Sequence, residues 1–466
     1  MALWLDRIND LLWNGILLWM MLGLGLWFTL RSGFYPIRKI REVWRFTFGS
    51  LFQKKKEKKK REGISPFAAV STALAGTIGT GNIAGVAVAL SVGGPGAVFW
   101  MWVSAVLGMM TKRTEIFLAV RYREKGSDGQ YYGGPMQYME KGLGSKPLAM
   151  LFSALCVAAS FGIGNMAQVH AAAQMVEQAF QVSPVWIGAL MAGICAIVLL
   201  GGAKRIAALN EKLVPAMGLF YIAGALLCLC CRFDRIGPAF SLIFTSAFSP
   251  EAAAGGAGGY ALSRAMRTGL ARGVFTNEAG LGSAPIAHAA AQTESAEKQA
   301  AWGVVEVFLD TLLMCTLTAL VILTANPELM NSGLSGAALT SSAFAETLGE
   351  SVEGFLSVSM VSFATASILG WAFYGQRALF YLTGGRAGAQ LGYRFLFLLF
   401  IVFGAVCTAD IVWNLSDLLN GLMALPNLAA LFLLSPYRKR KKSVSLSFSY
   451  DLPEEKPALP HEMLHR

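Results

Sequence analysis

Two stretches of the 466-residue chain combine glycines with hydroxyl and amide side chains inside otherwise apolar sequence. The first, at residues 75–85, reads AGTIGTGNIAG, and the second, at residues 272–283, reads RGVFTNEAGLGS. Glycine weakens a helix and tolerates unusual backbone angles, so both runs predict an interrupted helix. The N–H groups freed by an interruption bind carboxylates, and the freed carbonyls coordinate cations. The predicted chemistry is the binding of a small anionic or zwitterionic solute together with a cation.

The composition indicates that both runs lie inside a membrane. Hydrophobic residues make up 55% of the chain and charged residues 14%, and the mean hydropathy is +0.52. Soluble proteins carry about 25% charged residues. The 50 glycines fit closely packed transmembrane helices. The seven cysteines are scattered through apolar sequence, which excludes a secreted disulfide scaffold. The sequence therefore predicts an all-α polytopic membrane protein.

Eleven windows are long and apolar enough for a spanning helix, which needs about 20 residues. They lie at residues 11–30, 66–91, 96–120, 148–180, 184–201, 211–231, 265–290, 301–325, 354–380, 393–412 and 416–436. The two interrupted runs fall in the second and the seventh of these windows. We therefore expect two broken spans.

Basic residues set the predicted orientation. Much of the net charge of +11 lies at residues 54–61 and 438–442, next to spans. Lys and Arg in short loops favour the cytoplasmic side, so we expect the loop at 31–65 and the C-terminal tail inside and the N-terminus outside. Such blocks can also contact anionic lipids, and no RNA-recognition or helix-turn-helix pattern accompanies them, so no nucleic-acid partner is expected. Several arginines near the connection at 233–262 disagree with this orientation, which predicts an interfacial or re-entrant segment there.

The spacing of the two broken spans is more informative than either run. Each is the first of a group of five spans, and because five is odd the two groups enter the membrane from opposite sides. Paired broken helices in an inverted repeat mark the binding site of secondary transporters. If the chain had only one such run, close packing of helices would explain its glycines equally well.

The predicted organisation is an extra helix at 1–35, a basic loop at 36–65, a first repeat at 66–231, a connection at 232–264, a second repeat at 265–436 and a tail at 437–466.

Six motifs make the chain resemble the alanine or glycine:cation symporter family. They are GTGNIAGV at 79–86, GGPGAVFWMW at 93–102, GGPM at 133–136, TNEAGLG at 276–282, EVFLDT at 306–311 and ILGW at 368–371. The resemblance implies a LeuT-type fold, a 5+5 inverted repeat with one extra N-terminal helix. It also implies sodium-coupled, sometimes proton-coupled, uptake of alanine, glycine or a related small neutral amino acid across the bacterial inner membrane.

The expected substrate site combines the two breaks with two further helices. Its residues are Thr80, Gly81, Asn82, Gln168, Phe275, Thr276, Asn277, Gly280 and Trp371. Backbone N–H groups and the Thr80 hydroxyl would hold the carboxylate, while carbonyls of the second break would receive the ammonium and Phe275 would limit side-chain volume. The alternatives are a hinge in which Asn82 satisfies neighbouring backbone, an interhelical hydrogen bond for Gln168, and ordinary core packing for Trp371.

The resemblance also implies a sodium site of oxygen atoms, as a hard cation prefers. Its expected ligands are the carbonyls of Ala75 and Ile78 and the hydroxyls of Thr365 and Ser367. Family members often have two adjacent hydroxyl residues where this chain has Ala366 beside Ser367, so proton coupling stays open.

Glu278, Glu306 and Asp310 are among the acidic residues inside predicted spans, where a carboxylate is a functional candidate by default. Glu278 is expected to pair structurally, with a cation or proton role as the alternative. Glu306 and Asp310 share one helix face and are expected to pin broken-helix backbone, with an ion relay as the alternative. His170 and His288 have no partners at metal spacing and are expected to be packing residues.

Other classes of function fit the sequence less well. A channel would be expected to use identical filters from several subunits, and no Walker loop, zinc motif or nucleophile-and-base set indicates an enzyme. We expect no cofactor apart from Na⁺ as coupling ion, and no obligatory protein partner. The expected partners are a small amino acid and the lipid bilayer. Glutamine-specific transport by the same fold stays an alternative.

Overall fold

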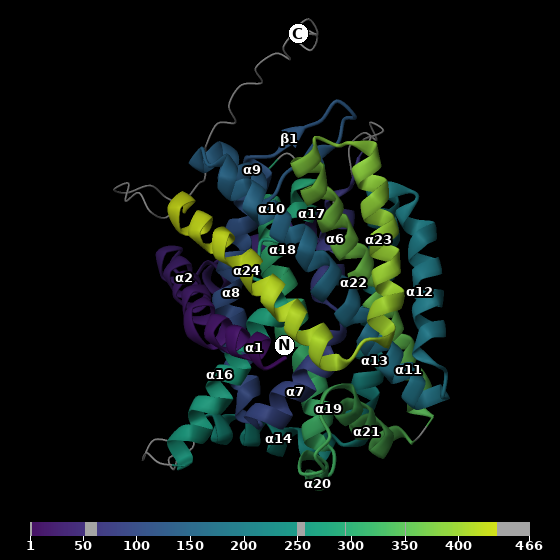
Figure 1. Ribbon diagram of the computed structural model, residues 1–466. Helices are drawn as coiled ribbons and strands as arrows, with labels where there is room; N and C mark the ends of the chain where they lie inside the picture. Colours follow the sequence, from purple (N-terminus) through teal and green to yellow (C-terminus); the bar gives the residue numbers. More distant parts are fainter. Residues whose placement is uncertain (1, 52–62, 249–256, 294, 350, 436–466) are drawn as a thin grey trace, which may run out of the picture.

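The computed structural model describes residues 2–51, 63–248, 257–293, 295–349 and 351–435, which are almost entirely helical (Figure 1). One hairpin, formed by β1 (Glu124–Lys125) and β2 (Tyr131–Tyr132), pairs antiparallel. The basic runs at 54–61 and 438–442 and the whole predicted tail at 437–466 lie outside the described residues.

The first half of the chain contains two irregular helical segments within its long helices. Its helices are α1 (Ala2–Asn9), η1 (Asp10–Leu17), α2 (Leu18–Arg31), α3 (Tyr35–Arg38), α4 (Ile40–Phe46), α5 (Phe48–Leu51), α6 (Pro66–Thr77), η2 (Thr80–Asn82), α7 (Ala84–Gly93), α8 (Gly96–Arg121), α9 (Pro135–Gln137), η3 (Tyr138–Gly142), α10 (Lys146–Phe161), η4 (Gly162–Met166), α11 (Ala167–Phe180), α12 (Pro184–Leu199) and α13 (Gly202–Cys231). The segments η1 and η4 are wider, π-type turns that continue directly into α2 and α11.

The second half begins with a helix in the predicted connection. Its helices are α14 (Phe233–Ala247), α16 (Ala257–Asn277), α17 (Ala284–Ala289), α18 (Ala296–Val307), η5 (Phe308–Cys315), α19 (Thr316–Thr324), α20 (Pro327–Met330), α21 (Gly336–Leu348), α22 (Val352–Thr383), α23 (Ala387–Val406) and α24 (Ala409–Leu434). The hairpin and α9 lie at one end of the molecule, and α20 and α21 lie at the opposite end (Figure 1).

Among the described residues, seven helical segments are long and apolar enough to cross a membrane. They are Arg7–Arg31, Lys146–Phe180, Gly202–Cys231, Ala296–Thr324, Val352–Thr383, Ala387–Val406 and Ala409–Leu434. An eighth is formed if Pro66–Thr77 and Thr80–Gly93, which bend by 55° at a short break, count as one span. The predicted broken second span is therefore confirmed, while the count of eleven stays a prediction.

Two predicted boundaries are wrong. The window at 393–412 runs across a real helix end, because α23 stops at Val406 and Cys407 and Thr408 are extended before α24 begins. In the second break, helix α16 continues to Asn277, so the interruption starts at Glu278 rather than near Arg272.

Two of the arginines that disagree with the predicted orientation have structural partners. Arg232 and Arg235 each donate to the carbonyl of Thr324, the last residue of α19, at 3.0 and 3.2 Å. Arg232 also pairs with Glu346 at 3.0 Å. Cationic groups favour a helix C-terminus because its free carbonyls carry partial negative charge. These two arginines therefore hold the end of α19, which is a structural reason for their positions.

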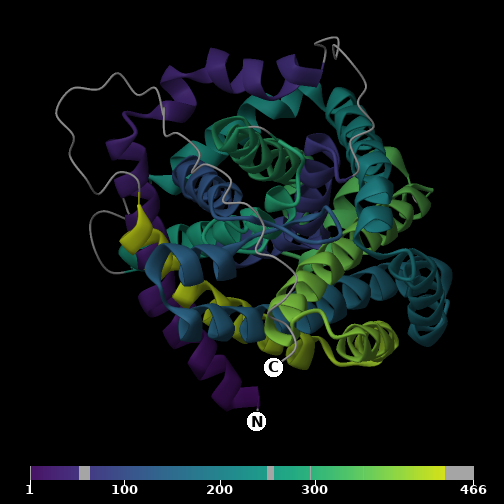
Figure 2. The ribbon, with the colours of Figure 1, turned by 90° about the horizontal axis from the view of Figure 1, so that it is seen from above.

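The central pair of helices is α8 and α16, which pack along one another. A Cβ atom at Gly273 would lie 2.0 Å from Ser104 Oγ, and one at Gly269 would lie 2.2 Å from the Ala97 carbonyl oxygen. Only glycine allows the two backbones to approach this closely. The view from above places α3–α5 at the periphery, outside this centre (Figure 2). The close packing brings the second break against α8.

Candidate functional site

The first break lies between α6 and α7, and α22 approaches it. The Ser367 hydroxyl, on α22, donates to the Ala75 carbonyl at 2.8 Å and lies 3.5 Å from the Ile78 carbonyl. A Cβ atom at Gly79 would meet Ser367 Oγ at 2.6 Å, so a side chain there would push α22 away. The structure thus brings together three of the four residues that were predicted to hold a cation.

The fourth predicted ligand does not join this group. Thr365 stands two positions before Ser367 on α22, and side chains two positions apart on a helix do not face the same way. The prediction that its hydroxyl meets the carbonyls of Ala75 and Ile78 finds no support in this geometry.

Gln168 connects the first break to α11. Its side-chain oxygen accepts from the backbone N–H of Thr80 at 3.3 Å and from the Thr80 hydroxyl at 3.1 Å. Its amide nitrogen donates to the Ile163 carbonyl in η4 at 3.0 Å. Two polar groups predicted to meet the substrate, Thr80 and Gln168, therefore lie in direct contact with each other.

Asn82 joins the first break to η5. Its oxygen accepts from the N–H of Gly79 at 2.9 Å, and its nitrogen donates to the Asp310 carboxylate at 2.7 Å. The second carboxylate oxygen of Asp310 accepts from the Thr311 hydroxyl at 2.7 Å. The bond from Gly79 is the alternative that the sequence left open for Asn82, in which its side chain satisfies neighbouring backbone. The bond between Asn82 and Asp310 agrees with the expected role of Asp310, which is to hold a broken helix.

The second break runs from Glu278 to Ser283. Its backbone turns through positive φ at Glu278 (53°), Gly280 (97°) and Gly282 (86°), a conformation that favours glycine and is unusual for glutamate. The Glu278 carboxylate accepts from the Ser283 hydroxyl at 2.6 Å, so it closes this turn on itself. The expected structural pairing of Glu278 was with Arg272 or another helix, whereas this bond is to a serine of the same break.

The predicted residues of the second break point in different directions. Thr276 faces the first break, because a Cβ atom at Gly81 would lie 3.3 Å from its methyl group. The ring of Phe275 lies 6.3 Å from Trp13 in η1, so it contacts the N-terminal helix. Gly280 faces Leu428 on α24, which a Cβ atom there would meet at 3.0 Å. Of the contacts described for these three residues, that of Thr276 is the one that reaches the first break.

Trp371 lies fully buried on α22. A Cβ atom at Gly164 would overlap it at 2.3 Å, so the indole packs directly on η4, and its ring lies 5.5 Å from that of Tyr374. These contacts are those of a core tryptophan, the alternative to a pocket wall.

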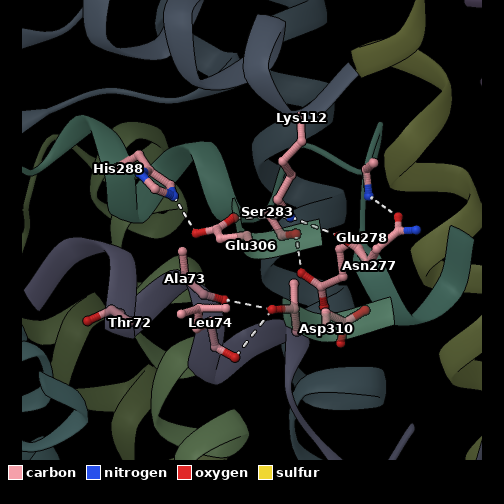
Figure 3. A network of polar contacts seen from close by, with 12 residues as sticks. Thr72, Ala73, Leu74, Lys112, Asn277, Glu278, Ser283, His288, Glu306 and Asp310 are labelled. Atoms are coloured by element: carbon pink, nitrogen blue, oxygen red, sulfur yellow. Dashed lines mark hydrogen bonds and ion pairs between the residues drawn. The ribbon is translucent and has the colours of Figure 1, made fainter. Parts of the chain in front are cut away.

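A buried ion pair lies beside the second break and was missed from the sequence (Figure 3). The ammonium of Lys112, on α8, donates to the Asn277 carbonyl at 3.0 Å and lies 3.8 Å from the Glu306 carboxylate. The sequence could have indicated this ion pair, because Lys112 is a charged residue inside the apolar window at 96–120. An ionisable side chain in a span is a functional candidate by default.

His288 belongs to the same network and is not the packing residue that the sequence suggested. Its Nε2 lies 2.5 Å from the Glu306 carboxylate, and the Gln299 amide nitrogen donates to its Nδ1 at 2.9 Å. Asn427, on α24, is a further buried polar residue that contacts the second break. Its amide donates to the Gly280 carbonyl at 2.9 Å and to Glu115 at 2.6 Å. Asn427 and its two partners lie far apart in sequence, so the spacing of residues does not reveal these bonds.

Comparison with known proteins matches residues 1–445 to the model of the sodium:alanine symporter family. The chain belongs to this family. The sodium/alanine symporter AgcS of Methanococcus maripaludis is 42% identical over 92% of this chain and 94% of its own. The probable sodium/glutamine symporter GlnT of Bacillus subtilis is 37% identical over 92% of this chain and 87% of its own.

Among solved structures, MhsT in complex with L-phenylalanine superposes with a TM-score of 0.59. It is 18% identical and covers 80% of this chain and 90% of that chain, so the likeness shows the fold. Membership of the family and this fold make the chain a multi-pass membrane transporter of LeuT type. The 5+5 repeat within that fold stays a prediction.

Proposed function

We propose that the protein imports a small neutral amino acid, alanine or glycine, together with sodium by alternating access. The observation that carries this proposal is the oxygen cluster at the first break, formed by the Ser367 hydroxyl and the carbonyls of Ala75 and Ile78. Oxygen ligands suit a hard cation, and carbonyls at a broken helix are free to coordinate one. The name of its relative AgcS supports sodium and alanine as the pair.

The proposed place for the amino acid is the space between the two breaks. The N–H groups around Thr80 and Gly81 lie at a helix interruption and suit a carboxylate. The two breaks approach closely, since a Cβ atom at Gly81 would lie 3.3 Å from the Thr276 methyl group, and this supports a substrate with a small side chain. Because the N–H and the hydroxyl of Thr80 donate to the Gln168 oxygen, binding of the substrate carboxylate at Thr80 would require Gln168 to release these two donors.

We further propose the bacterial inner membrane as location, with the hairpin end in the cytoplasm and the end with α20 outside. The basic loop at 36–65 and the tail from 437 onward support this orientation. Residue Leu434, which precedes the tail, lies against Gly142 of η3 at the hairpin end.

Uptake into proteoliposomes tests the function. We expect labelled alanine to accumulate when sodium is supplied outside, and choline in place of sodium to abolish accumulation. Competition by glycine, serine and glutamine identifies the substrate, with glycine expected to compete and glutamine not. Accumulation that follows a proton gradient and ignores sodium would establish proton coupling instead, and equilibration without accumulation would indicate a passive pore.

A further inference from the structure

Lys112 places a positive charge at the end of a broken helix. Asn277, whose carbonyl receives the ammonium at 3.0 Å, is the last residue of α16. Carbonyls at a helix C-terminus have no partner within the helix and carry partial negative charge, so they attract cations. The Lys112 side chain is fully buried (0% exposed), so its ammonium is shielded from water at this position.

The environment of the ammonium is that of a cation site. The Glu306 carboxylate, 1% exposed, lies 3.8 Å from Lys112 Nζ on one side and contacts His288 on the other. The Nδ1 atom of His288 lies 2.9 Å from the amide nitrogen of Gln299, so the ring is held on both sides. Lys112 supplies a lysine ammonium beside the Glu306 carboxylate. A buried carboxylate without a cation is strongly unfavourable, so this charge is required there.

The first break presents the same kind of carbonyls to a different partner. The carbonyl of Ala75 accepts a neutral hydroxyl from Ser367 at 2.8 Å, and that of Ile78 lies 3.5 Å from the same oxygen. The two breaks thus differ in charge, because one has a lysine ammonium at its helix end and the other has a serine hydroxyl. A neutral hydroxyl adds an oxygen to a cation site without occupying the place of the cation.

We propose that Lys112 is a built-in cation that takes the place of a coupling ion at the second break, so that each transport cycle carries a single sodium ion, bound at the first break. This inference rests on the proposed sodium symport and adds its stoichiometry. It makes Lys112 a positioning residue, which holds α16 and the neighbouring turn through the Asn277 carbonyl. Because the ammonium is covalently attached to the chain, it holds α16 in every state of the transport cycle and uses none of the sodium gradient.

The decisive measurement uses the unmodified protein in proteoliposomes, with sodium and alanine fluxes followed together by radioactive labels. We expect equal molar fluxes of sodium and alanine. Two sodium ions per alanine would overturn the proposal, because a second mobile ion would then be bound in addition to Lys112. An absence of coupled sodium flux would refute the proposed sodium symport itself, and this result is distinct from a flux ratio of two.

Two variants test the role of the charge. Lys112→Ala removes the ammonium and leaves space, so we expect weak alanine uptake at ordinary sodium concentrations. Added methylammonium should restore uptake several-fold, and the sodium dependence should become sigmoidal because a second sodium ion can fill the vacated place. Lys112→Met fills the same space without charge, so methylammonium should not rescue it.

Both variants must first be shown to reach the membrane in normal amounts. Lys112→Met with unchanged uptake and unchanged sodium dependence would overturn the proposal, since a merely apolar side chain would then suffice. An inserted Lys112→Ala protein that gains nothing from methylammonium and keeps a hyperbolic sodium dependence would overturn it as well. If neither variant is inserted, the flux ratio of the unmodified protein decides alone.

Discussion

Ser367 is the side chain that joins α22 to the end of α6, and the proposed sodium site depends on its hydroxyl. Ser367→Ala removes one oxygen from that site and leaves the Ala75 and Ile78 carbonyls in place. We expect the half-saturating sodium concentration to rise several-fold, corresponding to about 1 kcal/mol for one lost ligand or hydrogen bond. Alanine affinity at saturating sodium should change much less. The measurement is alanine uptake as a function of sodium concentration.

Ser359→Ala is the matched control, because this serine is also buried on α22 and its hydroxyl donates to the carbonyl of Phe355 within its own helix. Its sodium dependence should match that of the unmodified protein. Equal sodium dependence in both variants would place the cation away from Ser367.

At the residue scale, the prediction worked where the resemblance to the family implied which segments meet. The run around Ala75 and Ile78 and the position of Ser367 were predicted to meet, and they lie in contact. Lys112 and His288 were missed because their partners come from other helices, at positions set by packing. Periodicity along one helix cannot identify such a partner.

At the element scale, the two broken helices approach one another at Gly81. Gly81→Ala adds a Cβ atom 3.3 Å from the Thr276 methyl group, which is tighter than ordinary contact. If the substrate lies between the breaks, we expect a several-fold higher half-saturating concentration for alanine and a smaller rise for glycine, which lacks the methyl group. Competition curves with both amino acids measure this difference.

The control for that variant lies one turn further along the same chain. Gly85→Ala places its Cβ atom 4.0 Å from the same methyl group, an ordinary van der Waals distance. Its transport of alanine and glycine should be close to normal. Equal losses for alanine and glycine in Gly81→Ala would indicate a general disturbance of the break, and the substrate would then lie elsewhere.

Helix boundaries show why the elements could be predicted only in part. The first break was visible because glycines and polar residues interrupt apolar sequence, and the chain bends there by 55°. The end of α23 at Val406 was missed because apolar residues continue on both sides of it, so hydropathy stays high across the turn. The end of α16 was placed too early because Gly273, read as a helix breaker, instead allows close packing on α8.

At the scale of the whole molecule, the two ends should face different compartments. Ser127 lies in the hairpin loop and Ser332 between α20 and α21, and both are exposed. The hairpin and α20 lie at opposite ends of the molecule (Figure 1). In intact cells, a membrane-impermeant thiol reagent should label Ser332→Cys and spare Ser127→Cys, with the unmodified chain as background. Permeabilised cells should label both. The reverse pattern would invert the proposed orientation.

Transport by the whole molecule should also respond to voltage, because the proposed cargo is one sodium ion with a zwitterion and therefore carries net positive charge inward. Each such charge gains about 2.3 kcal/mol per 100 mV. That energy corresponds to a roughly fiftyfold change in the alanine ratio at equilibrium. In proteoliposomes with equal sodium on both sides, an inside-negative potassium diffusion potential should therefore drive alanine accumulation, and an inside-positive potential should oppose it. Uptake that is sodium-dependent but indifferent to this potential would mean that a compensating charge moves with the substrate, and the proposed cargo would be wrong.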